Sequence, residues 1–224
     1  MHIVDTLIAE RGRLVMASPW WPVIKPFAYK ILRYRSAVDM ADTIANMEPK
    51  AVFDHLSELL TLNVTTLGLE RVPAEGPVVL VSNHPTGIAD GVVLYDAIKK
   101  RRSDLAIFAN RDAIRINPRL SKMIVPVEWR SGFKSREKTK ETLKIAANAF
   151  SSQQVVVLFP SGRLAYWNDG KLTERPWMTS ALALARKNKA PIIPMHMGGR
   201  NSGLFYFLAR VSTELRDMTV FNEL

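Results

Sequence analysis

Residues 77–90 read Pro-Val-Val-Leu-Val-Ser-Asn-His-Pro-Thr-Gly-Ile-Ala-Asp, and the predicted fold is built outward from this stretch. The β-branched run at 78–81 predicts a short buried strand, which ends where polar residues begin. A proline and a glycine then interrupt the backbone, and the apolar spacing of residues 88–99 predicts a helix. His84 is therefore expected at the carboxyl end of a strand, shortly before a helix.

His84 and Asp90 have the residue types of a general base and of a carboxylate that orients it. Ligands usually bind at the carboxyl ends of strands in open α/β sheets, which is where His84 is predicted to lie. Ser82, Asn83 and Thr86 supply further polar groups nearby. In the structural alternative, His84 caps a turn and Asp90 caps the helix, and both interpretations are kept at this point.

Apolar runs and amphipathic stretches alternate along most of the chain. The predicted strands are 63–69, 78–81, 105–108, 123–127, 155–159 and 192–197, and the predicted helices are 37–47, 49–60, 88–99, 135–150, 176–188 and 202–224. This alternation predicts an α/β fold with a mostly parallel central sheet flanked by helices. We expect residues 1–60 to form an N-terminal helical region and residues 61–224 to form the α/β domain.

Aromatic and basic side chains alternate in residues 18–35 of the N-terminal region. Such a mixture is typical of the boundary between water and lipid, so the sequence predicts an amphipathic helical layer that contacts a membrane. The chain has no run of about 18 uninterrupted apolar residues, so we expect this layer to lie on a membrane rather than to cross it. The alternative is an aromatic layer that covers the core of a soluble domain.

Composition limits the possible chemistry. The chain has no cysteine, and its four histidines lack metal-ligand spacing, so we predict neither a disulfide nor a metal site. The net charge of +10 predicts an anionic partner: a nucleic acid, an acidic bilayer or an acidic carrier protein. Because nucleic-acid-binding motifs are absent from the sequence, we expect no nucleic-acid partner.

Three further predicted strands run into loops that carry an arginine: Arg130, Arg163 and Arg200. If the strands are parallel, these loops converge with His84 at one edge of the sheet. Guanidinium groups bind anions, so this arrangement suits an anionic substrate whose hydroxyl is deprotonated by the histidine. Gly162 and the pair at 198–199 would let backbone approach the ligand or donate to an oxyanion. A single arginine in such a loop is more often a solvated surface charge, but the repetition after successive strands favours a shared site.

Four sequence blocks, in order, resemble the lysophospholipid acyltransferase superfamily of PlsC-type 1-acylglycerol-3-phosphate acyltransferases. The chain is most similar to the hemolysin-like branch, which includes lyso-ornithine-lipid acyltransferases. The blocks are residues 83–91, 125–130, 159–163 and 190–194, with Gly-Arg-Asn-Ser at 199–202 typical of the branch. The resemblance covers about Thr61 to Phe207.

This resemblance implies transfer of an acyl chain from acyl-ACP or acyl-CoA to the hydroxyl of a lysolipid such as lysophosphatidic acid, in membrane lipid biosynthesis. It implies direct transfer, without a metal, a cofactor or a covalent acyl-enzyme, with His84 as general base and Asp90 orienting it. The expected substrate-binding residues are Asn83, Thr86, Gly87, Arg130, Ser161, Gly162, Arg163 and Arg200. The expected location is peripheral, on an anionic membrane surface at the cytoplasmic face of the inner or plasma membrane.

Departures from the family pattern define the alternatives. Five residues separate His84 from Asp90, as in the hemolysin-like branch, whereas four residues are commonest in the superfamily as a whole. Ser161 replaces the glutamate of the third block, which keeps a lyso-ornithine or other lyso-aminolipid as an alternative acceptor. A non-catalytic, hemolysin-like lipid-binding protein is an alternative of another class. Because the chain stops at Leu224, residues 202–224 are expected to be a lipid-side helix or the start of a missing tail.

Overall fold

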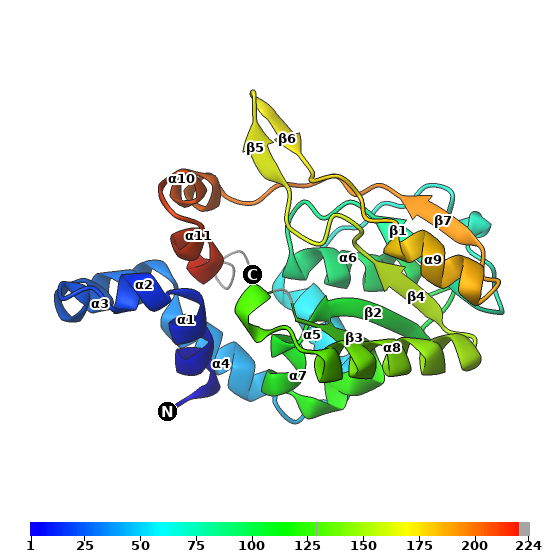
Figure 1. Cartoon of the computed structure of the whole chain (residues 1–224), viewed down its shortest axis with the longest axis horizontal. Helices are drawn as coiled ribbons and strands as arrows, with labels where there is room; N and C mark the ends of the chain where they lie inside the picture. The colour runs from blue at the N-terminus through cyan, green and yellow to red at the C-terminus, as the bar shows by residue number, and fades with distance from the viewer. Residues whose placement is uncertain (129, 220–224) are drawn as a thin grey trace.

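The computed structural model describes residues 1–128 and 130–219, and its centre is a five-stranded parallel sheet (Figure 1). Its strands, in spatial order, are β3 (Ile124–Val127), β2 (Leu105–Asn110), β4 (Val155–Leu158), β1 (Val78–Ser82) and β7 (Ile192–Met195). All four pairs of neighbouring strands are parallel. The predicted α/β class with a parallel central sheet is therefore confirmed.

Strand β1 shows why these apolar runs form a buried sheet. Val78 and Leu80 point into one core, and Val79 and Val81 point into the other. Helices α5 (Pro49–Leu59) and α6 (Ile88–Ile98) contribute to the first core, and helices α8 (Arg136–Ser151) and α9 (Ser180–Lys187) contribute to the second. A parallel strand covered on both faces is mostly apolar, as β1 is from Val78 to Val81.

The N-terminal helices pack together with the end of the chain. Helices α1 (Ile3–Arg11), α2 (Arg13–Met16), α3 (Trp21–Ile31) and α4 (Tyr34–Ile44) share a cluster with Met218, and α7 (Asp112–Ile116) borders this cluster. Met218 lies on α11 (Thr213–Thr219), which follows α10 (Gly203–Val211). Figure 1 shows α10 and α11 at the same end of the molecule as α1, α2 and α3. Within residues 1–128 and 130–219, no helix is long and apolar enough to span a bilayer.

Several predicted boundaries were wrong. Residues 63–69 form no strand, and none of them is fully buried; the segment ends in the short 3-10 turn Leu69–Arg71. The single helix predicted for 202–224 is two helices, separated by the extended residue Ser212, and residues 220–224 lie outside the described part. Helix α9 begins at Ser180 rather than at residue 176.

One element was not predicted at all. Strands β5 (Tyr166–Asn168) and β6 (Lys171–Thr173) form an antiparallel hairpin between β4 and α9. Two short 3-10 helices, Pro118–Lys122 and Ser131–Phe133, complete the described elements. In Figure 1 the hairpin projects from the body of the molecule beside α10.

Candidate active site

The imidazole of His84 lies at the carboxyl edge of the sheet, just after β1, and pairs with Asp90. Its Nδ1 is 2.8 Å from Asp90 Oδ2, and the Asp90 carboxylate is buried. The other ring nitrogen, Nε2, makes no hydrogen bond to any residue of the described part of the chain. With Nδ1–H donating to the carboxylate, Nε2 keeps its lone pair and is the atom that can accept a proton.

The loop between the two residues is closed by Asp90 itself. Asp90 is the third residue of α6, and its Oδ2 accepts from the backbone N–H groups of Thr86 and Gly87, both at 2.9 Å. The Thr86 hydroxyl donates to the other carboxylate oxygen. Gly87 has φ +100°, which an L side chain rarely adopts. The five-residue spacing therefore keeps the histidine and the carboxylate in contact, because Asp90 reaches back over a glycine turn.

The backbone of His84 is held by the segment that contains the hairpin. Its N–H donates to the Glu174 carboxylate, and its C=O accepts from the N–H of Ala165 at 2.9 Å. The Trp177 indole also donates to Glu174, at 2.7 Å. Phe159, which follows β4, stacks on the imidazole with ring centroids 4.2 Å apart. Sequence reasoning missed Glu174, which lies 90 residues from His84 along the chain and carried no motif.

Several residues predicted to bind substrate have structural partners. Asn83 bridges to Met197, donating to its C=O at 2.8 Å and accepting from its N–H at 2.7 Å. Ser161 is buried and donates to the backbone C=O of Arg163. The N–H of Gly162 donates to Phe159, so it is already used within the turn and is not a free oxyanion donor.

The expectation that Arg130 faces the imidazole is not met. Its guanidinium donates to Glu128, at 2.9 and 3.1 Å, and to Glu10 of α1. Hydrogen bonds from Arg115 and Arg130, acting against burial, lower the pKa of Glu10 to about 2. Burial by itself raises the pKa of Glu128, but hydrogen bonds led by that from Arg130 lower it to about 2. The hydrogen bond to Glu128 in turn raises the pKa of Arg130. Arg130 thus joins α1 to the loop after β3.

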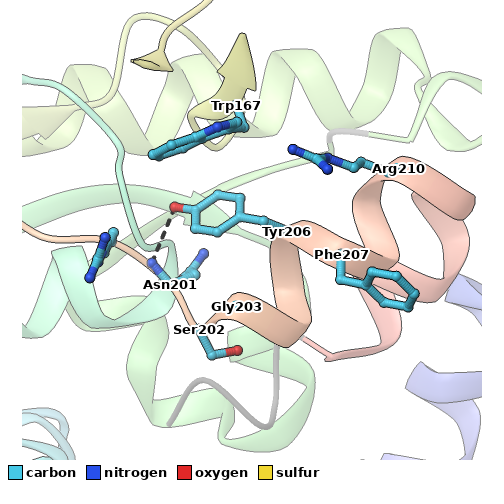
Figure 2. A pocket seen from close by; sticks show the side chains of 8 residues that line it. Trp167, Asn201, Ser202, Gly203, Tyr206, Phe207 and Arg210 are labelled. Atoms are coloured by element: carbon cyan, nitrogen blue, oxygen red, sulfur yellow. Dashed lines mark hydrogen bonds between the residues drawn. The ribbon is translucent and has the colours of Figure 1, made fainter. Parts of the chain in front are cut away.

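The other two predicted arginines lie on exposed loops. Arg163 follows the turn after β4, and no hydrogen bond or ion pair of its side chain is found among the described residues. Arg200 follows β7 and lines a cavity of about 570 Å³ between the hairpin and α10 (Figure 2). Gly199 lies against the active-site loop, because a Cβ built on it would be 3.4 Å from Thr86 Cγ2. The structure thus places the Arg200 loop beside the loop of His84 and Asp90.

Metal binding has no support in this arrangement. Among residues 1–128 and 130–219, no three histidine, aspartate or glutamate side chains are grouped so that they could hold an ion. The site instead offers an imidazole oriented by a buried carboxylate and stacked on an aromatic ring. This arrangement can remove a proton from a hydroxyl that is brought to Nε2.

Two curated proteins are similar to this chain. A lyso-glycine lipid O-acyltransferase of Bacteroides thetaiotaomicron is 29% identical over 158 residues, which are 70% of this chain and 56% of that protein. A protein of the same name from Phocaeicola vulgatus is 27% identical, over 70% of this chain and 55% of its own length. The chain thus spans about half the length of the curated relatives it matches. No solved structure matches.

The family model described as "Acyltransferase" matches residues 63–198, which include β1, the His84 loop, the hairpin and β7. The resemblance drawn from the four sequence blocks is thereby confirmed at the level of the superfamily. Since the match covers more than half of the chain, this protein belongs to the acyltransferase family.

Proposed function

We propose that this protein is an O-acyltransferase that moves a fatty acyl chain from an acyl thioester to the hydroxyl of a lysolipid. The observation that carries this proposal is the pairing of His84 Nδ1 with the buried Asp90 carboxylate, which leaves Nε2 without a partner among the described residues. A general base held in this way contributes about 10² to 10⁴ in rate. Family membership supports the same chemistry.

In the proposed reaction, His84 Nε2 takes the proton of the acceptor hydroxyl as its oxygen attacks the thioester carbonyl carbon. The carbonyl electron pair moves to oxygen and returns as the carbon–sulfur bond breaks. The imidazolium, stabilised by the Asp90 carboxylate, then gives its proton to the leaving thiolate. The products are an ester of the acceptor and a free thiol, so neither a metal nor a redox cofactor takes part.

We infer that the acceptor is an amino-acid-containing lysolipid rather than lysophosphatidic acid. Both curated relatives are named for lyso-glycine lipid. Ser161, in place of the family's glutamate, is buried and engaged with the backbone of its own turn, so the acceptor side of the third block differs from the usual one. Lyso-ornithine lipid and lysophosphatidic acid are the acceptors to compare.

We further propose that the donor is acyl-ACP or acyl-CoA and that the protein works on an anionic membrane surface. Large apolar side chains are exposed on α3 and α10, including Phe27 at 69% and Phe207 at 63%. Lys25, Lys30 and Arg210 are exposed on the same helices. Apolar side chains beside cations suit a peripheral location on anionic lipid, which would be the cytoplasmic face of the inner or plasma membrane.

The test is thiol release from acyl-ACP and from acyl-CoA with lyso-glycine lipid, lyso-ornithine lipid or lysophosphatidic acid as acceptor. We expect wild type to turn over and His84→Ala to be slower by about 10² to 10⁴. His55→Ala, on α5 and outside the site, is the matched control and keeps the wild-type rate. Acceptor-dependent release that is equal in wild type and His84→Ala would overturn the proposal.

A non-catalytic lipid-binding protein is the alternative, and it explains the exposed apolar side chains equally well. It gives no reason for a buried carboxylate that orients an imidazole. The alternative predicts vesicle binding without thiol release from any of these donors.

A further inference from the structure

The cavity between the β5–β6 hairpin and the start of α10 is distinct from the space around the imidazole. Figure 2 shows Trp167 of the hairpin above Tyr206 of α10, with Arg210 extending from α10 toward the two rings. The two ring centroids are 5.7 Å apart. Arg200 and Asn201 line the cavity from the segment that follows β7.

The cavity is positively charged. Within residues 1–128 and 130–219, neither Arg200 nor Arg210 has a carboxylate partner, and no acidic residue lines the cavity. Arg130 and Arg115 contrast with them, since both are paired with carboxylates. Two guanidinium groups without counter-charges attract an anionic ligand.

Asn201 supplies an independent observation that points to a ligand. Its side chain is only 7% exposed, and its Nδ2 is buried without a hydrogen-bond partner. Its backbone N–H donates to the Tyr206 hydroxyl at 3.2 Å, as Figure 2 shows. Buried amides are nearly always hydrogen-bonded, so this one lacks an acceptor that a bound group could supply after a small rearrangement of the side chain. The N-terminus of α10, where Ser202 caps Phe205, adds further positive potential.

The surroundings favour an amphiphilic ligand that reaches the reacting atoms. Phe207 lines the cavity and is exposed beside the apolar surface of α10, so an apolar chain can follow the anion. Both walls are attached to the active-site loop: Glu174, just past the hairpin, accepts from the His84 N–H, and Gly199 packs on Thr86. The segments that form the cavity are therefore connected to the loop that carries His84.

We propose that this cavity binds the anionic headgroup of the acceptor lysolipid, a carboxylate or a phosphate, through Arg200, Arg210 and the Asn201 amide. The Trp167 and Tyr206 rings cover the headgroup, and the lipid's apolar chain leaves along Phe207. The proposal rests on the proposed function, because it names the place where that reaction's acceptor is held.

A binding measurement without donor tests the cavity separately from catalysis. The probes are a short-chain lyso-glycine lipid below its micelle concentration, its methyl ester, which lacks the charge, and lysophosphatidic acid. The readout is tryptophan fluorescence, corrected with Trp167→Phe. For the charged probes we expect Arg210→Gln to raise Kd at least about tenfold, whereas the ester binds weakly to both proteins. Arg186→Gln, an exposed arginine on α9, is the matched control. Equal Kd values for acid and ester, or for wild type and Arg210→Gln, would overturn the assignment.

Turnover then separates the acceptor from the donor as the source of the anion. With each substrate varied in turn while the other is saturating, Arg210→Gln is expected to raise the acceptor KM about tenfold and to leave the donor KM unchanged. A higher donor KM with an unchanged acceptor KM would overturn the assignment in favour of the donor's phosphates. If lipid binding depends on Arg210 but wild type releases no thiol, the proposed function fails and the headgroup site stands.

Discussion

Glu174, which directly follows the unpredicted hairpin, connects this segment to the active site by binding the His84 backbone. Its carboxylate accepts from the His84 backbone N–H and from the Trp177 indole. Replacing it with alanine removes the acceptor that holds His84, so we expect kcat to fall by about 10- to 100-fold with little change in either KM. Glu174→Gln keeps one carbonyl oxygen for the His84 N–H and should recover most of the rate. A Glu174→Ala variant with wild-type kcat would show that the contact does not position His84.

Gly87 is the turn residue that lets Asp90 reach His84. At its φ of +100°, an alanine Cβ would also lie 3.0 Å from a Leu164 methyl carbon. We expect Gly87→Ala to lower the free energy of unfolding by about 1 to 2 kcal/mol and to reduce acyl transfer, because the loop must shift. Gly91→Ala, one turn into α6 with no atom within 4 Å of the added Cβ, should instead raise stability by about 0.5 to 1 kcal/mol. Urea unfolding of both variants checks the contrast.

The proximity of His84 and Asp90 could be predicted because both positions are local. One follows a strand and the other lies in the first turn of the next helix, six residues away. The partners of Asn83, Arg130 and Glu174 could not be predicted in the same way. Their contacts join positions 90 to 120 residues apart, and only the folded chain brings these together.

At the scale of elements, a cluster of ion pairs joins α1 to the α/β domain. The Glu10 carboxylate accepts hydrogen bonds from both terminal nitrogens of Arg115, at 2.6 and 2.9 Å, and from the Arg130 guanidinium. Arg11 of the same helix pairs with the buried Asp112 at 2.7 Å. The N-terminal helices are thus attached through buried and half-buried charges as well as through apolar packing.

This cluster predicts a loss of stability in acid. The pKa of Glu10 falls from 4.5 to about 2 on folding, so its contribution to stability is complete above about pH 4.5 and is lost as the pH falls toward 2. We expect the Tm of Glu10→Gln to be lower than that of wild type at pH 7 and the difference to shrink between pH 4.5 and 2. Thermal unfolding across this range is the measurement. Glu58→Gln, an exposed carboxyl on α5, is the control, and a constant Tm difference for Glu10→Gln would contradict the assignment.

The sheet was the most predictable part of the fold, because short, continuous runs of β-branched residues strongly favour buried strands. Five of the six predicted strands are present, and each is packed in a core on at least one face. The sixth, residues 63–69, forms no strand, because its side chains are exposed or half-buried rather than packed in a core. The hairpin was missed because β5 is exposed along its length and β6 is at most half-buried, so neither strand has an apolar core pattern.

At the scale of the whole molecule, a group of exposed apolar side chains lies on α3 and α10, away from the sheet. Trp20, Phe27 and Ile31 lie on or next to α3, and Phe207 and Val211 lie on α10; all are exposed by half or more of their surface. Figure 1 places both helices at one end of the molecule. Exposed apolar groups of this size are unfavourable in water unless a partner covers them. The cavity proposed for the headgroup is lined by α10 and borders this end, so the proposed membrane location would place the cavity next to lipid.

Vesicle binding tests this arrangement. Burying one aromatic side chain contributes up to about 1.5 to 3 kcal/mol, so we expect Phe27→Ser to weaken binding to anionic vesicles by about tenfold or more. Leu182→Ser, which changes an exposed apolar residue on α9, is the matched control and should bind as wild type does. Wild-type binding should also weaken as the salt concentration rises from about 0.05 to about 0.5 M, because salt screens the attraction between anionic lipid and the cations on α3 and α10. If Phe27→Ser and Leu182→Ser bind equally well, α3 does not contact the bilayer, and its apolar residues must be covered by protein instead.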